Sequence, residues 1–216
     1  MGPTAIAQDY CGARELAEAP WRVAASYAWL ASELRFGAES APFHQLSVAV
    51  SITRRLGAGF TVQAGAGAVT GGGIDAAGVS YAMQPGWIAR LGSTWLALDG
   101  KEGPWPFLAV SASLAASGVR TAASGQPEEA LTALDLGLSA SAGKAFFGVV
   151  APYVGARVFG GPVEWTIAGR PVTGTDVNHW QVAFGVAASL PLGLDALLEW
   201  APFGEHSLVA QAGWAF

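Results

Sequence analysis

The residues best suited to chemistry are three histidines, each at the start of a segment in which apolar and polar residues alternate. They are His44, His179 and His206, with Glu39, Glu164, Asp176 and Glu205 in the stretches beside them. Histidine beside a carboxylate suits general acid–base hydrolysis or a metal site. Because no fixed ligand spacing links the three histidines, we expect no metal site. A hydrolase that uses one of these histidines is kept as an alternative.

The run Glu205-His206-Ser207 contains the three residue types of a hydrolytic triad. Neighbouring residues of a strand point to opposite faces, so these three side chains cannot converge in an extended segment. The chain also has no phosphate-binding loop, no Cys/His metal pattern and no serine elbow. We therefore predict no catalytic residue, no cofactor and no enzymatic activity.

A second group of charged residues lies on the same side of the alternating segments as Ser, Thr and Gly. The group has three residues of each sign: Arg22, Arg90, Asp135, Arg157, Asp195 and Glu199. If that side faces an interior, the charges need partners, because an unpaired buried charge is costly. We expect an interior network of ion pairs, with selectivity for a permeating solute as the alternative role.

The composition indicates which kind of element positions these residues. Apolar residues make up 52% of the chain and charged residues only 12%, about half the usual share of a soluble domain. The longest uncharged run, 56–74, contains seven glycines, which makes it a poor membrane helix. Alternating strands of a membrane barrel fit this composition better. The net charge of −5 argues against a nucleic-acid partner.

Alternation with a period of two recurs along the chain and is clearest in the last nine residues, 208–216. It predicts ten strands, at 21–30, 44–53, 59–69, 79–98, 106–116, 130–142, 147–159, 179–190, 194–201 and 208–216. Long connections (31–43, 70–78, 117–129 and 160–178) alternate with short turns, and only the link 202–205 is shorter than this alternation requires. A closed ring requires the last strand to pair with 21–30.

Tryptophans mark both ends of the predicted apolar face. Trp21 and Trp29 are eight residues apart on one face, a rise of about 27 Å along a strand, and Trp87 and Trp95 repeat the spacing. Aromatic rings collect at the two interfaces of a membrane. The predicted girdle consists of Trp21, Trp29, Trp87, Trp95, Trp180, Trp200 and Trp214.

The alternation, the girdle and the terminal Trp214 and Phe216 resemble those of small bacterial outer-membrane β-barrel proteins, over about residues 21–216. The resemblance implies an all-β fold: a closed antiparallel transmembrane barrel of about ten strands, an up-and-down meander with short periplasmic turns and longer extracellular loops. It also implies that Trp214 and Phe216 form an insertion signal, that both termini are periplasmic, and that lipid, lipopolysaccharide and the barrel-assembly machinery are the partners.

Residues 1–20 lack the alternation, so we expect a segment that lies in the periplasm or plugs the barrel, ahead of a barrel domain at 21–216. Most of an export signal is expected to lie outside the chain, and the single cysteine, Cys11, cannot form an internal disulfide. The predicted function is structural anchoring or binding of a periplasmic or surface partner through the extracellular loops or the lumen. A narrow passive channel for small solutes or ions is the alternative.

Overall fold

Antiparallel strands account for nearly all of the chain that the structure, a computed structural model, describes: residues 20–216 without 58, 101–104, 126 and 168. The predicted segment 1–20, apart from Pro20, lies outside the described residues, as does Cys11. The strands are β1 (Trp21–Phe36), β2 (Glu39–Gly57), β3 (Phe60–Ala76), β4 (Val79–Met83), β5 (Gly86–Leu98), β6 (Phe107–Ala122), β7 (Glu129–Gly143), β8 (Val150–Gly160), β9 (Val163–Ile167), β10 (Arg170–Asp176), β11 (Trp180–Ser189), β12 (Leu194–Gly204) and β13 (His206–Ala215).

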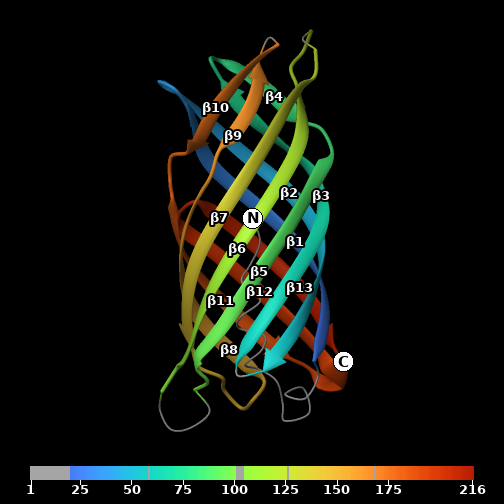
Figure 1. Cartoon of the computed structure of the whole chain (residues 1–216), viewed down its shortest axis with the longest axis vertical. Helices are drawn as coiled ribbons and strands as arrows, with labels where there is room; N and C mark the ends of the chain where they lie inside the picture. The colour runs from blue at the N-terminus through green and yellow to red at the C-terminus, as the bar shows by residue number, and fades with distance from the viewer. Residues whose placement is uncertain (1–19, 58, 101–104, 126, 168) are drawn as a thin grey trace.

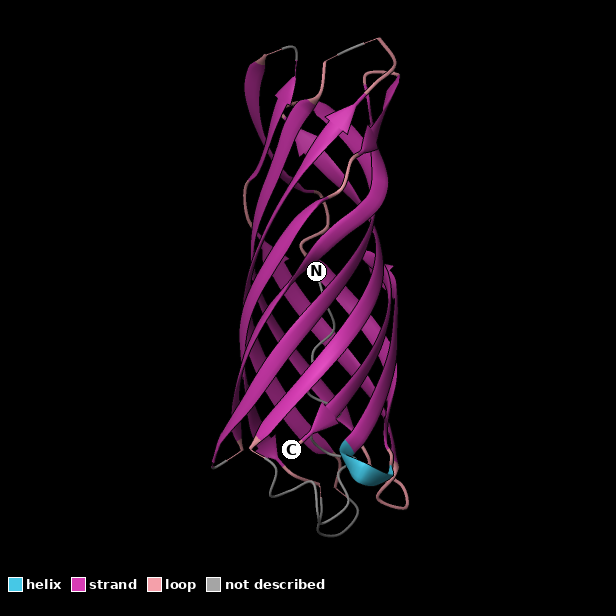
Figure 2. Cartoon of the chain, turned by 90° about the vertical axis from the view of Figure 1, so that its right-hand side faces the viewer, coloured by secondary structure: helices cyan, strands magenta, loops and turns pink. Residues whose placement is uncertain are grey.

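The strands close into a tilted barrel (Figures 1 and 2). In its lower part, the described residues form a ring of ten strands in the order β1, β2, β3, β5, β6, β7, β8, β11, β12 and β13. The first and last strands pair from Arg22 opposite Ala215 to Ala31 opposite His206. The all-β fold class, the antiparallel meander and the pairing of the two terminal strands are thus confirmed. No described helix is long and apolar enough to cross a membrane.

The upper part of the barrel is a narrower ring. Here β4 replaces β5 beside β6, and the β9–β10 hairpin spans the wall between β7 and β1. Strands β8, β11, β12 and β13 end below this level, so the described ring narrows from ten strands to eight: β1, β2, β3, β4, β6, β7, β9 and β10. A barrel of about eight strands has an interior that side chains can fill.

Much of the sequence predicted as long loops belongs to this upper ring. Strands β1 and β2 continue to the pair Phe36–Glu39, and 163–176 is mostly a hairpin. The reason is a reversal of faces: in the lower barrel apolar residues point outward, whereas in the upper ring they point inward, as Leu34 does. In the upper ring the strands therefore have polar residues on the outer face, so the alternation used to predict the lower strands does not extend into them.

The predicted strand 79–98 shows the reversal within one segment. An unbroken alternation over 79–98 places Tyr81 and Met83 on the same outer face as Trp87, but both are buried inside the barrel. The segment is interrupted between β4 and β5 at Gln84 and Pro85, which shifts the alternation to the other face. Proline has no N–H for a ladder hydrogen bond, so it favours such an interruption.

The short link at 202–205, exceptional in the sequence, has a structural reason. Strands β12 and β13 end at mid-height beneath the β9–β10 hairpin, so they need only a tight turn. Gly204 in this turn has φ of +77° and packs against the carbonyl of Trp180, a place where a Cβ would not fit.

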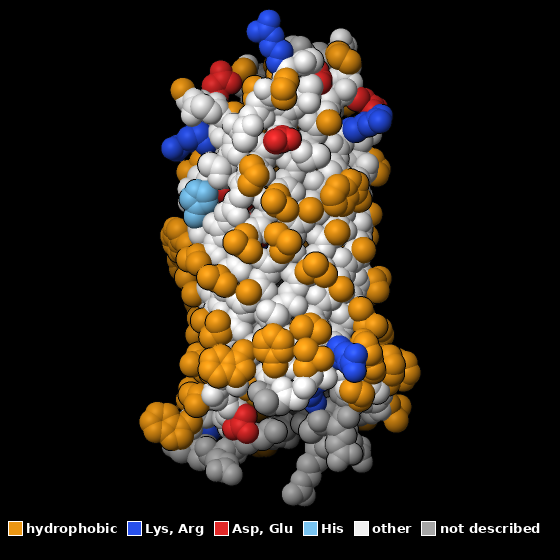
Figure 3. All heavy atoms as spheres, viewed as in Figure 1, with side chains coloured by type: hydrophobic (Ala, Val, Ile, Leu, Met, Phe, Trp, Pro, Cys, Tyr) orange, Lys and Arg blue, Asp and Glu red, His pale blue; other side chains and the backbone are white. Residues whose placement is uncertain are grey.

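The outer surface of the lower barrel is apolar. Large exposed side chains there include Val50, Leu91, Leu136 and Leu198. Figure 3 shows apolar side chains over the lower and middle barrel, with most charged side chains toward the upper end and a few near the lower end. The exterior therefore presents a band suited to lipid and, above it, a surface suited to water.

Candidate functional site

Five of the six charged residues predicted inside have a polar partner across the lumen wall. At the seam between the terminal strands, the Arg22 guanidinium donates from Nε to Asp195 Oδ2 at 2.7 Å and from Nη2 to Oδ1 at 2.6 Å. Both side chains are buried. The pair links β1 to β12 across β13, so it fastens three strands at the closing seam.

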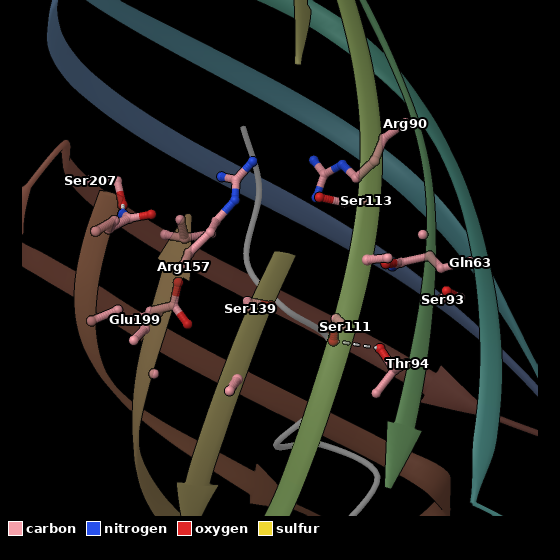
Figure 4. A pocket seen from close by; sticks show the side chains of 18 of the residues that line it. Gln63, Arg90, Ser93, Thr94, Ser111, Ser113, Ser139, Arg157, Glu199 and Ser207 are labelled. Carbon is pink, nitrogen blue, oxygen red and sulfur yellow. Dashed lines mark hydrogen bonds between the residues drawn. The ribbon is translucent and has the colours of Figure 1, made fainter. Parts of the chain in front are cut away.

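Two further contacts join the middle of the wall. Arg157 of β8 donates to Asp135 Oδ2 of β7 at 2.5 Å, and the Tyr153 hydroxyl donates to Glu199 Oε2 at 2.6 Å. Arg90 extends into the same space from the opposite wall (Figure 4). All six charged residues predicted inside thus face the lumen. Four of them form two separate ion pairs, and Glu199 accepts from Tyr153, which no sequence pattern singled out.

A glycine lies beneath each of these contacts. Gly185 stands directly between Tyr153 and Glu199 on neighbouring strands, and the tyrosine ring lies over it. Gly213 underlies the Arg22–Asp195 pair in the same way, and a Cβ built on Gly137 would lie 2.8 Å from Arg157 Nε. Part of the high glycine content is therefore explained: long polar side chains cross neighbouring strands where no Cβ obstructs them.

Gly185→Ala is expected to displace the Tyr153 ring and break its hydrogen bond to Glu199, because the added methyl group would overlap the ring. Overpacking of this kind costs about 1–3 kcal/mol. Urea unfolding in lipid vesicles, followed by tryptophan fluorescence, would measure the loss. Gly155→Ala is the matched control, since its Cβ would lie 3.7 Å from the nearest atom, an ordinary contact. Equal stability of the two variants would show that Tyr153 is not seated on Gly185.

The described residues line two cavities inside the barrel. One, of about 70 Å³, is lined largely by Ser, Thr, Gly and Ala together with Arg90, Arg157 and Glu199 (Figure 4). The other, of about 60 Å³, lies beneath the upper ring and is lined mainly by apolar side chains. Glu205 lines both. The lumen therefore has a polar chamber and an apolar chamber that meet at one carboxylate.

Above the apolar chamber, a hydrophobic core fills the upper ring. Trp165 of β9 is its largest member, with 1% of its surface exposed. It contacts Tyr81 edge to face at 5.0 Å between ring centroids, and its Nε1 donates to Thr121 Oγ1 at 3.0 Å. The other buried members of this outer core are Leu34, Ala41, Val69, Ile74, Met83, Val119, Leu131 and Val163. Close-packed apolar side chains of this kind leave little room for water inside the upper ring.

Solved structures with a similar arrangement come from the bacterial outer membrane. The translocator domain of the autotransporter NalP from Neisseria meningitidis is 14% identical with a TM-score of 0.52, and the match covers 91% of this chain and 88% of that one. The transport unit of the autotransporter AIDA-I from Escherichia coli is 9% identical with a TM-score of 0.50, over 98% of this chain and 95% of that one. No protein-family model and no curated protein matches the sequence.

The chain has the fold of bacterial outer-membrane β-barrel proteins. At this level of identity the likeness concerns the fold alone. Together with the apolar band on the lower exterior, it supports a location in a bacterial outer membrane.

The tryptophans of the predicted girdle project from the outside of this outer-membrane barrel. Trp87, Trp95, Trp180, Trp200 and Trp214 are about half exposed, and Trp21 and Trp29 are partly exposed. Trp214 donates from Nε1 to the Leu192 carbonyl at 3.1 Å, and its ring centroid lies 5.0 Å from that of Phe216. Trp105, 71% exposed at the lower end, was not included in the predicted girdle because it stands outside the alternating segments.

The three histidines project outward from the barrel. His44, His179 and His206 are exposed, and His44 and His206 lie on either side of Ala31 in the strand ladder. Glu205 and Ser207 are buried whereas His206 is exposed, so the side chains of the run Glu205-His206-Ser207 do not converge. Across the described chain, no group of three or more His, Cys, Asp or Glu residues is arranged to hold a metal ion.

Glu205 and Asp176 are luminal carboxylates that the sequence interpretation placed in loops instead. A usable signal existed: Asp195 and Glu199, before the turn, and Ser207, after it, all occupy inward-facing odd positions. Counting this alternation through the tight turn would have placed Glu205 inside. Its neighbour Gln181 is also inside and donates from Nε2 to Ser207 Oγ at 2.6 Å.

Proposed function

We propose that this protein is a non-enzymatic outer-membrane barrel that does not conduct at rest and that anchors its upper ring as a surface for binding a partner. The observation that supports the proposal is the outer core, whose buried apolar side chains pack together inside the upper ring. A barrel closed in this way serves as a support for what it displays more readily than as an open pore.

The exterior of the upper ring supports a binding role. Its strands and turns present mixed charges to water, among them Arg35, Glu39, Arg120, Glu128 and Glu164. Arg120 and Glu128 pair at 3.1 Å on the exposed rim. A partner with interspersed charges of both signs matches this surface. The outward, separated positions of the three histidines favour a non-enzymatic role.

The orientation belongs to the same proposal. Trp21 and Phe216 are joined by two backbone hydrogen bonds at the lower end of the barrel, which places the last residue beside the start of β1. We assign this end to the periplasm because the apolar band lies close to it, whereas the upper ring extends well beyond the band, as the extracellular parts of outer-membrane barrels do. In this orientation, lipid and lipopolysaccharide surround the apolar band. Trp214 and Phe216 then form the insertion signal that the barrel-assembly machinery recognises.

Planar-bilayer recording of the purified full chain tests the closed lumen. We expect no stable openings, because the outer core blocks the upper end. Stable openings of the full chain would contradict the proposal and favour a narrow passive channel through the polar chamber. If the full chain is silent but deletion of residues 1–20 produces openings, the predicted N-terminal plug rather than the outer core closes the barrel.

A further inference from the structure

Among the described residues, the buried carboxylate of Glu205 has no hydrogen-bond partner. Only 1% of the residue is exposed, and neither Oε1 nor Oε2 accepts a hydrogen bond from any described residue. It lies in the turn between β12 and β13 and lines both cavities. A buried carboxylate without hydrogen bonds is costly to maintain, so its surroundings point to a missing ligand.

Two further carboxylates lie near Glu205 and add negative charge to the same chamber. Asp135 and Asp176 line the same apolar chamber and are buried. Asp135 Oδ2 accepts a hydrogen bond from Arg157, but Asp135 Oδ1 has no hydrogen-bond partner in the described chain. Asp176 Oδ1 accepts from the Ser32 hydroxyl, at 3.0 Å. Among the described residues, Arg157 pairs with Asp135, and no cationic side chain contacts Glu205, so the chamber offers a carboxylate that a bound cation can pair with.

The rest of the chamber indicates what kind of cation fits. The wall beside the carboxylates is hydrocarbon, supplied by Leu30, Leu34, Phe43 and Ile88. The described acidic and histidine side chains are not grouped to hold a metal ion. An organic ammonium satisfies both features, since its N–H groups can donate to carboxylate oxygens while its carbon chain lies against the apolar wall.

We propose that the lumen beneath the outer core binds a small primary ammonium compound. Its charged nitrogen lies between Glu205 and Asp135, and its short hydrocarbon chain occupies the apolar chamber. The cavity of about 60 Å³ limits the ligand to a small body. The inference rests on the closed lumen of the proposed function, because an open, hydrated pore would screen the carboxylates.

Titration calorimetry of the full chain in detergent tests the site, with n-propylammonium chloride as the probe. We expect saturable binding, together with roughly tenfold or greater weakening in Glu205→Gln, which keeps the shape but removes the charge. Glu164→Gln, an exposed carboxylate on β9, is the matched control and should bind like the wild type. n-Propanol and sodium chloride should show no saturable heat.

Absence of saturable propylammonium binding by the folded wild type overturns the proposal. Equal affinity of the wild type and Glu205→Gln overturns it too, because the carboxylate would not hold the ligand. Heat-modifiable migration on gels verifies that each variant is folded. Calorimetry and single-channel recording test the two proposals separately. Channel openings together with normal propylammonium binding contradict only the closed lumen. Absence of both openings and binding contradicts only the ammonium site.

Discussion

Asp195→Ala is expected to lower the free energy of unfolding of the barrel by about 3–5 kcal/mol, because it leaves the Arg22 guanidinium buried without its carboxylate. The loss falls at the closing seam, where the pair connects β1 with β12 across β13. Arg22 Nη1 already lacks a hydrogen-bond partner among the described residues, so little else there can compensate. Urea unfolding in lipid vesicles, followed by tryptophan fluorescence, measures the change.

The control and the double variant separate charge from packing. Asp75→Ala removes an exposed carboxylate and should change stability only slightly. Arg22→Met combined with Asp195→Leu replaces the pair by apolar side chains and should recover much of the loss, since such replacements are often neutral. If Asp195→Ala unfolds at the same urea concentration as Asp75→Ala, the seam does not depend on the ion pair.

Trp165→Ala is expected to cost about 3–5 kcal/mol and to produce openings in planar bilayers. The substitution removes the largest side chain of the outer core, its ring contacts with Tyr81 and Phe36, and the donor to the buried Thr121 hydroxyl. Because the upper ring is narrow, the resulting void lies directly across the path through the lumen. Urea unfolding and single-channel recording measure the two effects.

Trp105→Ala is the matched control, since it removes an exposed tryptophan at the lower end of the barrel, away from the outer core. It should keep both the stability and the silence of the wild type. A silent Trp165→Ala variant with normal stability would show that the outer core is not what closes the barrel. Amide hydrogen exchange in β9 and β10 would then show whether the hairpin had loosened without opening the lumen.

The sequence alone determined the lower barrel. Lipid outside and a polar lumen inside impose opposite requirements on alternate residues, so Leu134, Leu136 and Leu138 point outward while Asp135 and Gly137 point inward. That contrast is written locally in every strand, and it therefore predicted the antiparallel ring, the inward charges and the pairing of the first and last strands. The girdle followed from the same spacing.

The upper ring and the luminal contacts depend on long-range packing and could not be predicted from local sequence patterns. Above the lipid band, the outer face of the barrel wall is in water and the inner face is apolar. Leu34, Tyr81 and Trp165 therefore form a core that the alternation in the lower strands did not predict. The partners of Asp195 and Glu199 depend on the stagger between strands far apart in the sequence. Whether Glu205 is a loop residue or a buried carboxylate depends on where β12 and β13 end beneath the β9–β10 hairpin, and long-range pairing sets that height.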